Sequence, residues 1–476
     1  MQFIVPHRDR LPDGAIELAY LAGHEEAPYQ TRTSWQGDRL VVQRDEAESA
    51  TFTIPWMIGD RPPLALSTGT LVERTRPYLL PVELARGTVY RLRTHAFVWQ
   101  ALGLVVPAEL SPLLKEALGA LARAATSQDQ PAAAAESAEQ ALVVALAGSA
   151  LLCAAYADQS RRARRTMSKR TPLVVGVPLD DDRSPDQPFA EFLLQACNTL
   201  SVPFNWRNVE ATAGAPSWQF SDVQIAWCQG HEKRICGGPL LRLERDALPD
   251  WIGTATDFGT LQASVARHVQ GVVERYRGRV HLWNCGAALN TAATLPLTEE
   301  QRLRLAVSAI ETVRAADRQT PVILTLDQPW GEALRDERRQ LSPIHFADAL
   351  VRGDLGLAGL GLRVDIGLSR DATLPRDALE ISRQIDRWSV FNLPLLIEFT
   401  LPPSVSLAHP SEQSWIEQVI PVLLGKPAVQ AVFWGRLLDG QGQPFADRGL
   451  FDLEGVPKPA LRAFSAIRRW AELPDI

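Results

Sequence analysis

Histidine and cysteine are scarce in this chain, with 8 and 5 copies among 476 residues. None of them stands at the spacing of zinc ligands, so the sequence predicts no metal site. The cysteines are odd in number, lie apart and mostly have apolar neighbours. This pattern favours buried thiols in a reducing compartment over a disulfide framework. They are Cys153, Cys197, Cys228, Cys236 and Cys285.

Other common signals are missing too. The N-terminus lacks the charged-then-apolar layout of a signal peptide, so we expect a cytoplasmic protein. The net charge is −6 and no basic cluster favours nucleic acid as a partner. The stretch from Gly176 to Asp180 lacks the G-x-G-x-x-G spacing of a phosphate-binding loop, and we expect no cofactor.

The residues from Ala141 to Ala157 are almost uncharged and precede a basic run, as a short membrane span would. They fall short of the ~20 residues that a span needs. Alanine rather than leucine dominates them. A buried helix is therefore the favoured interpretation, and we expect no membrane partner.

The composition, 46% apolar and 22% charged, is that of a soluble globular chain long enough for two or three domains. Residues 1–105 carry turn signals and short alternating runs, which predict an all-β, sandwich-like domain. The runs are Ala15–Tyr20, Arg39–Gln43, Ala50–Trp56, Leu64–Ser67 and Tyr78–Leu84.

Four aromatic residues of this domain allow two interpretations: Tyr29, Trp35, Trp56 and Trp99. They could offer stacking faces to sugar rings, as a carbohydrate-binding module does. They could instead fill the core, because aromatic side chains dominate the buried area of small domains. The core is the favoured interpretation.

Residues 106–170 are rich in alanine, leucine, glutamate and arginine, which are good helix formers. They predict the helices Leu110–Ala125 and Ala132–Met167 on either side of a break at Ser127–Pro131. We expect a helical bridge between the β domain and the rest of the chain.

From Pro172 onward, apolar runs of strand length alternate with amphipathic helical runs. This alternation predicts a parallel α/β barrel over residues 171–476, with its chemistry at the carboxyl ends of the strands. Strand runs include Leu173–Pro178, Val280–Trp283, Pro321–Leu326, Leu357–Val364 and Leu393–Ile397.

The barrel region also carries a series of motifs in a fixed order. Tyr276, Gly278, Val280 and Trp283 match the pattern Y-x-G-x-V-x-x-W. Further matches are Trp206, Glu210 and Gly214 (W-x-x-x-E-P-x-x-G), Leu248–Trp251 (L-P-x-W), Trp434–Gly435 (W-G), Leu450–Asp452 (L-F-D) and Lys458–Ala460 (K-P-A). With these motifs, residues 172–470 resemble glycoside hydrolase family 10, the xylanase family.

The resemblance implies a (β/α)8 barrel that acts on β-linked glycans with carboxyls from its fourth and seventh strands. The family's Asn-Glu pair of the fourth strand falls on Ala287 and Ala288, and an alanine cannot transfer a proton. The nucleophile of the seventh strand falls on Glu398 if one residue is deleted after Pro394, and on Phe399 by strict count.

Three carboxylates stand at the ends of neighbouring strands: Asp327, Asp365 and Glu398. They could form a relocated pair of acid and nucleophile, because the strand ends of a barrel meet at one face. Alternatively, Asp327 caps the next helix and Asp365 pairs with Arg363 or another barrel arginine. We favour Glu398 as a catalytic residue because it directly follows an apolar strand run.

Polar and aromatic residues near the strand ends are candidates for binding the carbohydrate. They are Trp206, Trp283, Asn284, Gln328, Trp330, Glu332, Arg363 and Trp434. Two functions stay open: a divergent glycoside hydrolase, and a non-catalytic descendant that binds glycan or a protein partner through the barrel mouth. No pattern indicates the oligomeric state.

Overall fold

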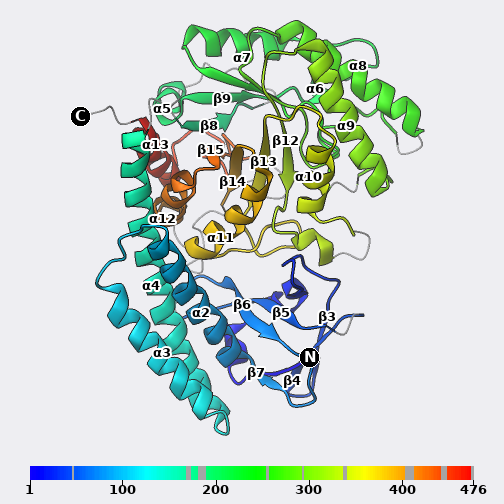
Figure 1. The fold of residues 1–476 in the computed structure, drawn as a ribbon. Coiled ribbons are helices and arrows are strands. Elements are labelled where there is room, and N and C mark those ends of the chain that lie inside the picture. The colour runs from blue at the N-terminus through cyan, green and yellow to red at the C-terminus, as the bar shows by residue number, and fades with distance from the viewer. Residues whose placement is uncertain are drawn as a thin grey trace.

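The computed structural model describes residues 1–45, 48–59, 61–167, 173–180, 189–253, 257–291, 294–335, 340–401, 412–440 and 447–472. The chain forms a β-rich N-terminal part, a group of long helices and a barrel, with the long helices running along one side of the other two (Figure 1).

Eight parallel strands close into a barrel in which each strand pairs with the next along the chain. The strands are β8 (Val174–Pro178), β9 (Thr199–Val202), β10 (Arg234–Gly237), β11 (Leu282–Asn284), β12 (Val322–Asp327), β13 (Gly359–Asp365), β14 (Leu395–Thr400) and β15 (Val429–Trp434). The predicted (β/α)8 barrel is therefore confirmed.

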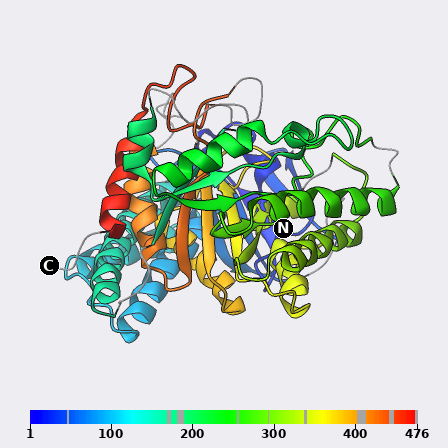
Figure 2. The same cartoon turned by 90° about the horizontal axis from the view of Figure 1, so that it is seen from above.

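Helices lie around the outside of these strands (Figure 1, Figure 2). They are α5 (Ala190–Ala196), α6 (Trp206–Val209), α7 (Gln219–Gly230), α8 (Phe258–Tyr276), α9 (Glu299–Ala316), α10 (Pro343–Arg352), α11 (Ala378–Trp388), α12 (Glu412–Gly425) and α13 (Pro459–Glu472), with the 3-10 turns η2 (Glu332–Arg335) and η3 (Ser389–Phe391).

The two faces of each barrel strand pack differently. Outward side chains such as Leu362 and Ile397 join the large core beneath the helices. A smaller cluster that includes Ile323 and Leu396 fills the barrel interior. Because side chains alternate along a strand, residues at even spacing from this inner cluster also point inward. Inward side chains near the carboxyl ends of the strands therefore line the barrel mouth.

The N-terminal part contains two sheets, with strand orders β3-β4-β1-β7 and β2-β5-β6. Their strands are β1 (Gln2–Ile4), β2 (Tyr20–Ala22), β3 (Arg32–Gln36), β4 (Arg39–Gln43), β5 (Ala50–Trp56), β6 (Leu64–Leu71) and β7 (Tyr78–Leu79), with the turns η1 (Arg8–Arg10) and α1 (Ala15–Leu18). The predicted runs Arg39–Gln43 and Ala50–Trp56 are strands. The run Ala15–Tyr20 is not, because α1 occupies most of it.

The predicted strand run Tyr78–Leu84 is correct only for Tyr78–Leu79, which form β7, because helix α2 (Leu80–Ala101) begins within it. Pro81 lies in the first turn of α2, where its missing N–H costs nothing. Val82, Ala85 and Val89 are buried at helical spacing, a period that a seven-residue window is too short to reveal. The β-rich part thus ends near Leu79 rather than at residue 105.

Helices α3 (Leu110–Thr126) and α4 (Pro131–Met167) follow the predicted ranges closely. Helix α4 packs against α2 and α3, and also against the barrel helices α11 and α12. Leu379 of α11 and Val422 of α12 share one hydrophobic core with α2 and α4. The helical part thus packs against both the N-terminal part and the barrel.

Helix α4 is long and apolar enough, over Pro131–Arg164, to cross a membrane, but half of its most apolar window is buried within the chain. The five cysteines are buried and free, as predicted for thiols. Trp56 and Trp99 are also buried, which confirms their place in the core.

The N-terminal part also contacts the loops that follow β12 and β13. Arg376 donates to Glu332 at 2.7 Å and to the hydroxyl of Tyr20 at 2.8 Å. The N–H of Ala65 donates to the carbonyl of Pro375 at 2.7 Å. These loops leave the carboxyl ends of their strands, so the N-terminal part lies beside the barrel mouth.

Candidate active site

Arg363 of β13 gathers carboxylates from three places at the barrel mouth. Its Nη2 lies 2.8 Å from Asp327 at the end of β12 and 2.9 Å from Glu244 in the loop after β10. Its Nε lies 3.4 Å from Asp365 at the end of β13. The alternative that pairs Asp365 with Arg363 is therefore correct, and Asp327 shares the same guanidinium.

Glu398 lies on the other side of Arg363. The strand register pairs Arg363 with Asp327 across β12 and β13, and with Glu398 across β13 and β14. Glu398 lies two residues beyond the inward-facing Leu396, so its side chain also points into the barrel. Within the described parts of the chain, the half-buried Glu398 carboxylate accepts no hydrogen bond.

The surroundings of Glu398 favour its protonated form. Burial raises the pKa of Glu398 to about 7, although Arg363 acts in the opposite direction. The negative charges of Asp365 and Asp327 add to the rise. Glu398 therefore exchanges its proton near neutral pH, where general acids and bases work best.

Asp365 is held in a different way. Its Oδ1 accepts a hydrogen bond from the Thr400 hydroxyl at 2.7 Å, and Arg448 donates to that hydroxyl at 3.2 Å. Burial lowers the pKa of Arg448 to about 10, so it remains a cation at neutral pH. Asp365 thus lies between two guanidinium groups.

Asp365 lies two residues along β13 from the register partner of Glu398. With strands about 4.8 Å apart and a rise of about 3.3 Å per residue, their Cα atoms are about 8 Å apart. Two inward side chains at this spacing can bring their carboxyl groups within the about 5–9.5 Å found in glycosidases.

Asp327 is fixed at both its backbone and its side chain. Asn290 pairs with its backbone N–H at 3.0 Å and with its carbonyl at 2.8 Å. Its Oδ1 is buried without a hydrogen-bond partner among the described residues. Burial raises the pKa of Asp327 and Arg363 opposes the rise. The alternative role as a helix cap is wrong, because the carboxylate faces Arg363 instead.

Glu244 and Arg242 complete the cluster, and neither was among the predicted site residues. Both follow β10 in a loop that contains the cis peptide bond Gly238–Pro239. Arg242 donates to Glu244 at 2.6 Å. Burial would raise the pKa of Glu244, but Arg363 and Arg242 outweigh it and lower the pKa to about 2. In the sequence, the oppositely charged Arg242 and Glu244 follow the apolar pair Leu240–Leu241. This pattern is the signal from which the two site residues could have been predicted.

Three tryptophans predicted to bind carbohydrate offer no face to solvent, and of the two roles open to Trp434, flooring a sugar subsite or closing the barrel, its burial favours the second. Trp206, Trp283 and Trp434 are 2%, 0% and 0% exposed. Their indole N–H groups donate to Glu210, Asp317 and the carbonyl of Arg448. Trp283 and Trp434 are on the outward faces of β11 and β15, among the helix-packing residues.

The other predicted binding residues make internal contacts. Glu332 is buried in its ion pair with Arg376, and Trp330 is 4% exposed. Gln328 donates to the carbonyl of Arg370, and Asn284 donates to Thr325 inside the barrel. Of the predicted binding residues, Arg363 is the one that lies among the carboxylates.

The loop after β11 is buried at Ala287 and Ala288, which are each 1% exposed. Ala288 has a left-handed backbone with φ 57°, an uncommon conformation for a residue other than glycine. Across the described ranges, no group of three or more His, Cys, Asp or Glu side chains could hold a metal ion.

Comparisons with known proteins found xylanases among the similar proteins. No protein-family model matches the chain. The endo-1,4-beta-xylanase 3 of Hypocrea jecorina is 29% identical over 79 residues, which are 17% of this chain and 22% of that protein. The chain therefore spans about a fifth of the length of the curated relative.

Solved structures of xylanases are similar in fold. Xylanase 10B from Thermotoga petrophila, bound to xylobiose, is 15% identical with a TM-score of 0.48, covering 65% of this chain and 96% of that one. Xylanase B from Clostridium stercorarium is 15% identical with a TM-score of 0.49, covering 64% and 98%. Likenesses at this level carry no argument about function.

Proposed function

We propose that this chain is a divergent glycoside hydrolase-like protein that acts on a β-linked glycan at the barrel mouth. The observation that carries the proposal is the environment of Glu398. Its carboxyl points inward, accepts no hydrogen bond in the described part of the chain and has a pKa raised to about 7 by burial. A carboxyl of this kind can donate a proton to a leaving oxygen at neutral pH.

Asp365 is the proposed partner of Glu398. Its carboxylate accepts a hydrogen bond from the Thr400 hydroxyl and lies 3.4 Å from Arg363, so it has its own partners while Glu398 has no hydrogen bond among the described residues. Glycosidases use two carboxyls, one as a proton-donating acid and the other as nucleophile or base. The roles differ from the sequence-based expectation, in which Glu398 was the nucleophile or base.

Arg363 is the proposed positioning residue of the pair. It holds Asp327 and Glu244 by short contacts and lies beside both Asp365 and Glu398. Its positive charge opposes the burial of these carboxylates and lowers the pKa of Glu244 to about 2. Asp327 then anchors the arginine rather than reacting.

The substrate class rests on two further supports. The motifs of residues 172–470 resemble the xylanase family, and the curated relative is named as an endo-1,4-beta-xylanase. We therefore propose a xylan-type glycan, with β-linked sugars, as the ligand.

A non-catalytic role in glycan or protein binding is the second candidate. It is favoured by Ala288, which the motif alignment puts in place of the family's acid/base residue and which has no proton to transfer. It is also favoured by Arg363, whose ion pairs neutralise acidic side chains at the mouth.

Hydrolysis of aryl β-xylosides and soluble β-glycans by wild type and Asp365→Asn separates the two candidates. The hydrolase proposal expects turnover by the wild type and a loss of at least about 100-fold in Asp365→Asn. Asp371 is an exposed carboxylate a few residues along the chain, and the control variant Asp371→Asn should retain full activity. Glycan binding without turnover by the wild type would favour the second candidate.

A further inference from the structure

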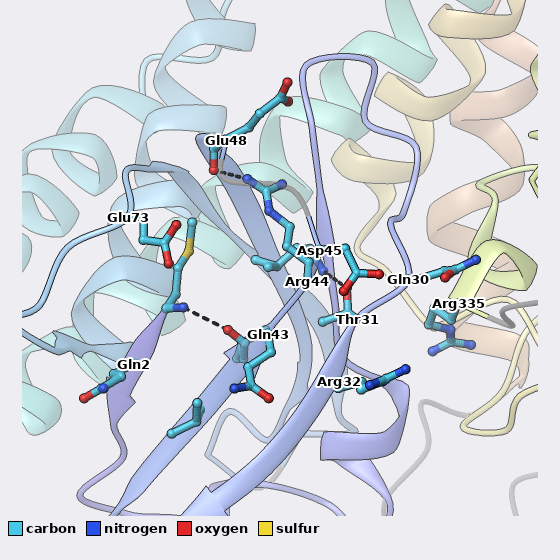
Figure 3. Close-up of a pocket in the computed structure, with 14 residues that line it drawn as sticks. Gln2, Gln30, Thr31, Arg32, Gln43, Arg44, Asp45, Glu48, Glu73 and Arg335 are labelled. Atoms are coloured by element: carbon cyan, nitrogen blue, oxygen red, sulfur yellow. Dashed lines mark hydrogen bonds between the residues drawn. The ribbon is translucent and has the colours of Figure 1, made fainter.

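A pocket of about 520 Å³ lies in the N-terminal part, and none of its lining residues belongs to the carboxylate cluster. Strands β1, β2 and β4 contribute to its walls, and Arg335 of η2 reaches it from the barrel side (Figure 3). The volume falls in the range of about 300–1,000 Å³ that is usual for small-molecule sites.

The side-chain charges around this pocket balance. Three arginines, Arg32, Arg44 and Arg335, lie around it together with Asp45, Glu48 and Glu73. Glutamines add neutral amide groups that both donate and accept hydrogen bonds. The lining side chains are therefore rich in donors and acceptors but carry no net formal charge, and the N-terminal ammonium of Met1, also in the lining, donates to the carbonyl of Val42.

Two of the arginines have a buried nitrogen that lacks a hydrogen-bond partner among the described residues: Nη1 of Arg44 and Nη2 of Arg335. At least one other nitrogen of each guanidinium is hydrogen-bonded. Arg335 donates from Nε to the carbonyl of Glu332 at 2.9 Å and from Nη1 to that of Leu18, and Arg44 donates to the carbonyl of Glu48. Buried polar groups are rarely left without a partner, so these donors call for an acceptor from a ligand or from water.

We propose that this pocket binds a neutral, hydroxyl-rich oligosaccharide, as a second contact for the glycan of the proposed function, on which this inference rests. A sugar hydroxyl can accept from a guanidinium and donate to a carboxylate at the same time. A phosphate or carboxylate ligand would face Asp45, Glu48 and Glu73 as like charges, and an apolar ligand would leave the arginine donors unpaired.

The position of Arg335 relates this pocket to the barrel mouth. Arg335 ends the turn η2, in the loop that begins directly after Asp327. A glycan held in the pocket therefore lies against the loop that leaves the candidate active site. Such an anchor should lower KM for a long glycan and leave kcat for a small aryl glycoside unchanged.

Calorimetric titration of the full chain with neutral β-linked hexasaccharides of xylose and of glucose tests the proposal. The Asp365→Asn background prevents hydrolysis during the titration. Arg44→Ala should weaken binding at the pocket by at least about tenfold, as expected for a lost charged hydrogen bond. Arg76→Ala, an exposed arginine of the same region outside the pocket, should bind like its parent. Gln43→Ala, at an exposed lining position, is the second pocket variant, and circular dichroism checks the fold of each.

The outcomes separate this proposal from the hydrolase proposal. Binding that is lost in Arg44→Ala and in Gln43→Ala supports the pocket, whether or not the wild type has turnover. Binding that both variants retain overturns the pocket proposal, and turnover by the wild type would then leave the hydrolase proposal intact. No hexasaccharide binding by any folded variant also overturns the pocket proposal, even if aryl glycosides are hydrolysed.

Discussion

Arg363 and Asp327 are paired twice, once through the backbone register of β13 and β12 and once through a contact of 2.8 Å between their side chains. The contact is buried at the barrel mouth, and Glu244 and Asp365 share the same guanidinium. The pairing places one cation among acidic groups. Glu398, on the next strand, makes no hydrogen bond to Arg363. This difference in contacts underlies the different roles proposed for the carboxyls.

Arg363→Met should lower the free energy of unfolding by about 3–5 kcal/mol at pH 7, because buried carboxylates lose their counter-charge. The loss should shrink as pH falls through the ordinary range of carboxyl pKa values, since protonated acids need no cation. Urea unfolding at pH 7, and at a pH below the ordinary carboxyl range, measures the loss of stability. Arg352→Met removes an exposed ion pair with Asp348 and should cost less than about 1 kcal/mol. Similar losses in both variants would contradict the prediction.

Glu398→Gln should change how stability depends on pH. The pKa of Glu398 is raised from 4.5 to about 7 on folding, so the folded state binds the proton more tightly. This stabilising contribution is complete below about pH 4.5 and is lost as pH rises through about 7. Glutamine resembles the protonated acid, so the variant should gain stability relative to wild type between these pH values. The exposed control Glu454→Gln should give a curve of stability against pH that is parallel to that of wild type. A parallel curve for Glu398→Gln as well would refute the prediction.

Glu332→Gln should loosen the contact between the N-terminal part and the barrel. It removes the counter-charge of Arg376, which is 3% exposed, and breaking a buried pair costs about 3–5 kcal/mol. Thermal unfolding and limited proteolysis of the N-terminal part would report it. Asp250→Asn, which breaks the exposed pair with Arg207, should have little effect on either measurement.

Trp434→Phe should lower stability by about 1–3 kcal/mol, because the carbonyl of Arg448 loses a buried donor. Glycan affinity should stay the same, since Trp434 is fully buried. Calorimetry and urea unfolding together measure the two effects. Weaker glycan binding at unchanged stability would instead indicate a sugar-facing tryptophan.

Strand-length apolar runs were enough to predict the barrel and the place of its carboxylates. Asp327, Asp365 and Glu398 each lie at or near the end of such a run, and parallel strands bring these ends together. The tryptophans could not be assigned in the same way. Whether Trp434 faces the mouth or the helices depends on strand register, and it is the outward partner of Phe399.

Glu244 and Arg242 could not be predicted from strand patterns at all. Glu244 contacts Arg363, with Arg242 beside Glu244, because the irregular loop after β10 folds back over the barrel. The backbone of Leu240 and Leu241 is hydrogen-bonded to Asn284 and Ala287 at the end of β11. Helix α2 was missed for a different reason, since its helical period emerges only over residues beyond the short run in which the strand was predicted.

The role of Glu398 as proton donor is tested most directly by the leaving-group dependence of Glu398→Gln. A general acid matters most when the leaving group is a sugar, and hardly at all when it is dinitrophenolate, which departs without a proton. The account predicts a loss of about 10²–10⁴-fold on a xylo-oligosaccharide and nearly unchanged turnover of a dinitrophenyl β-xyloside. Equal losses on both substrates, or no loss on either, would contradict it.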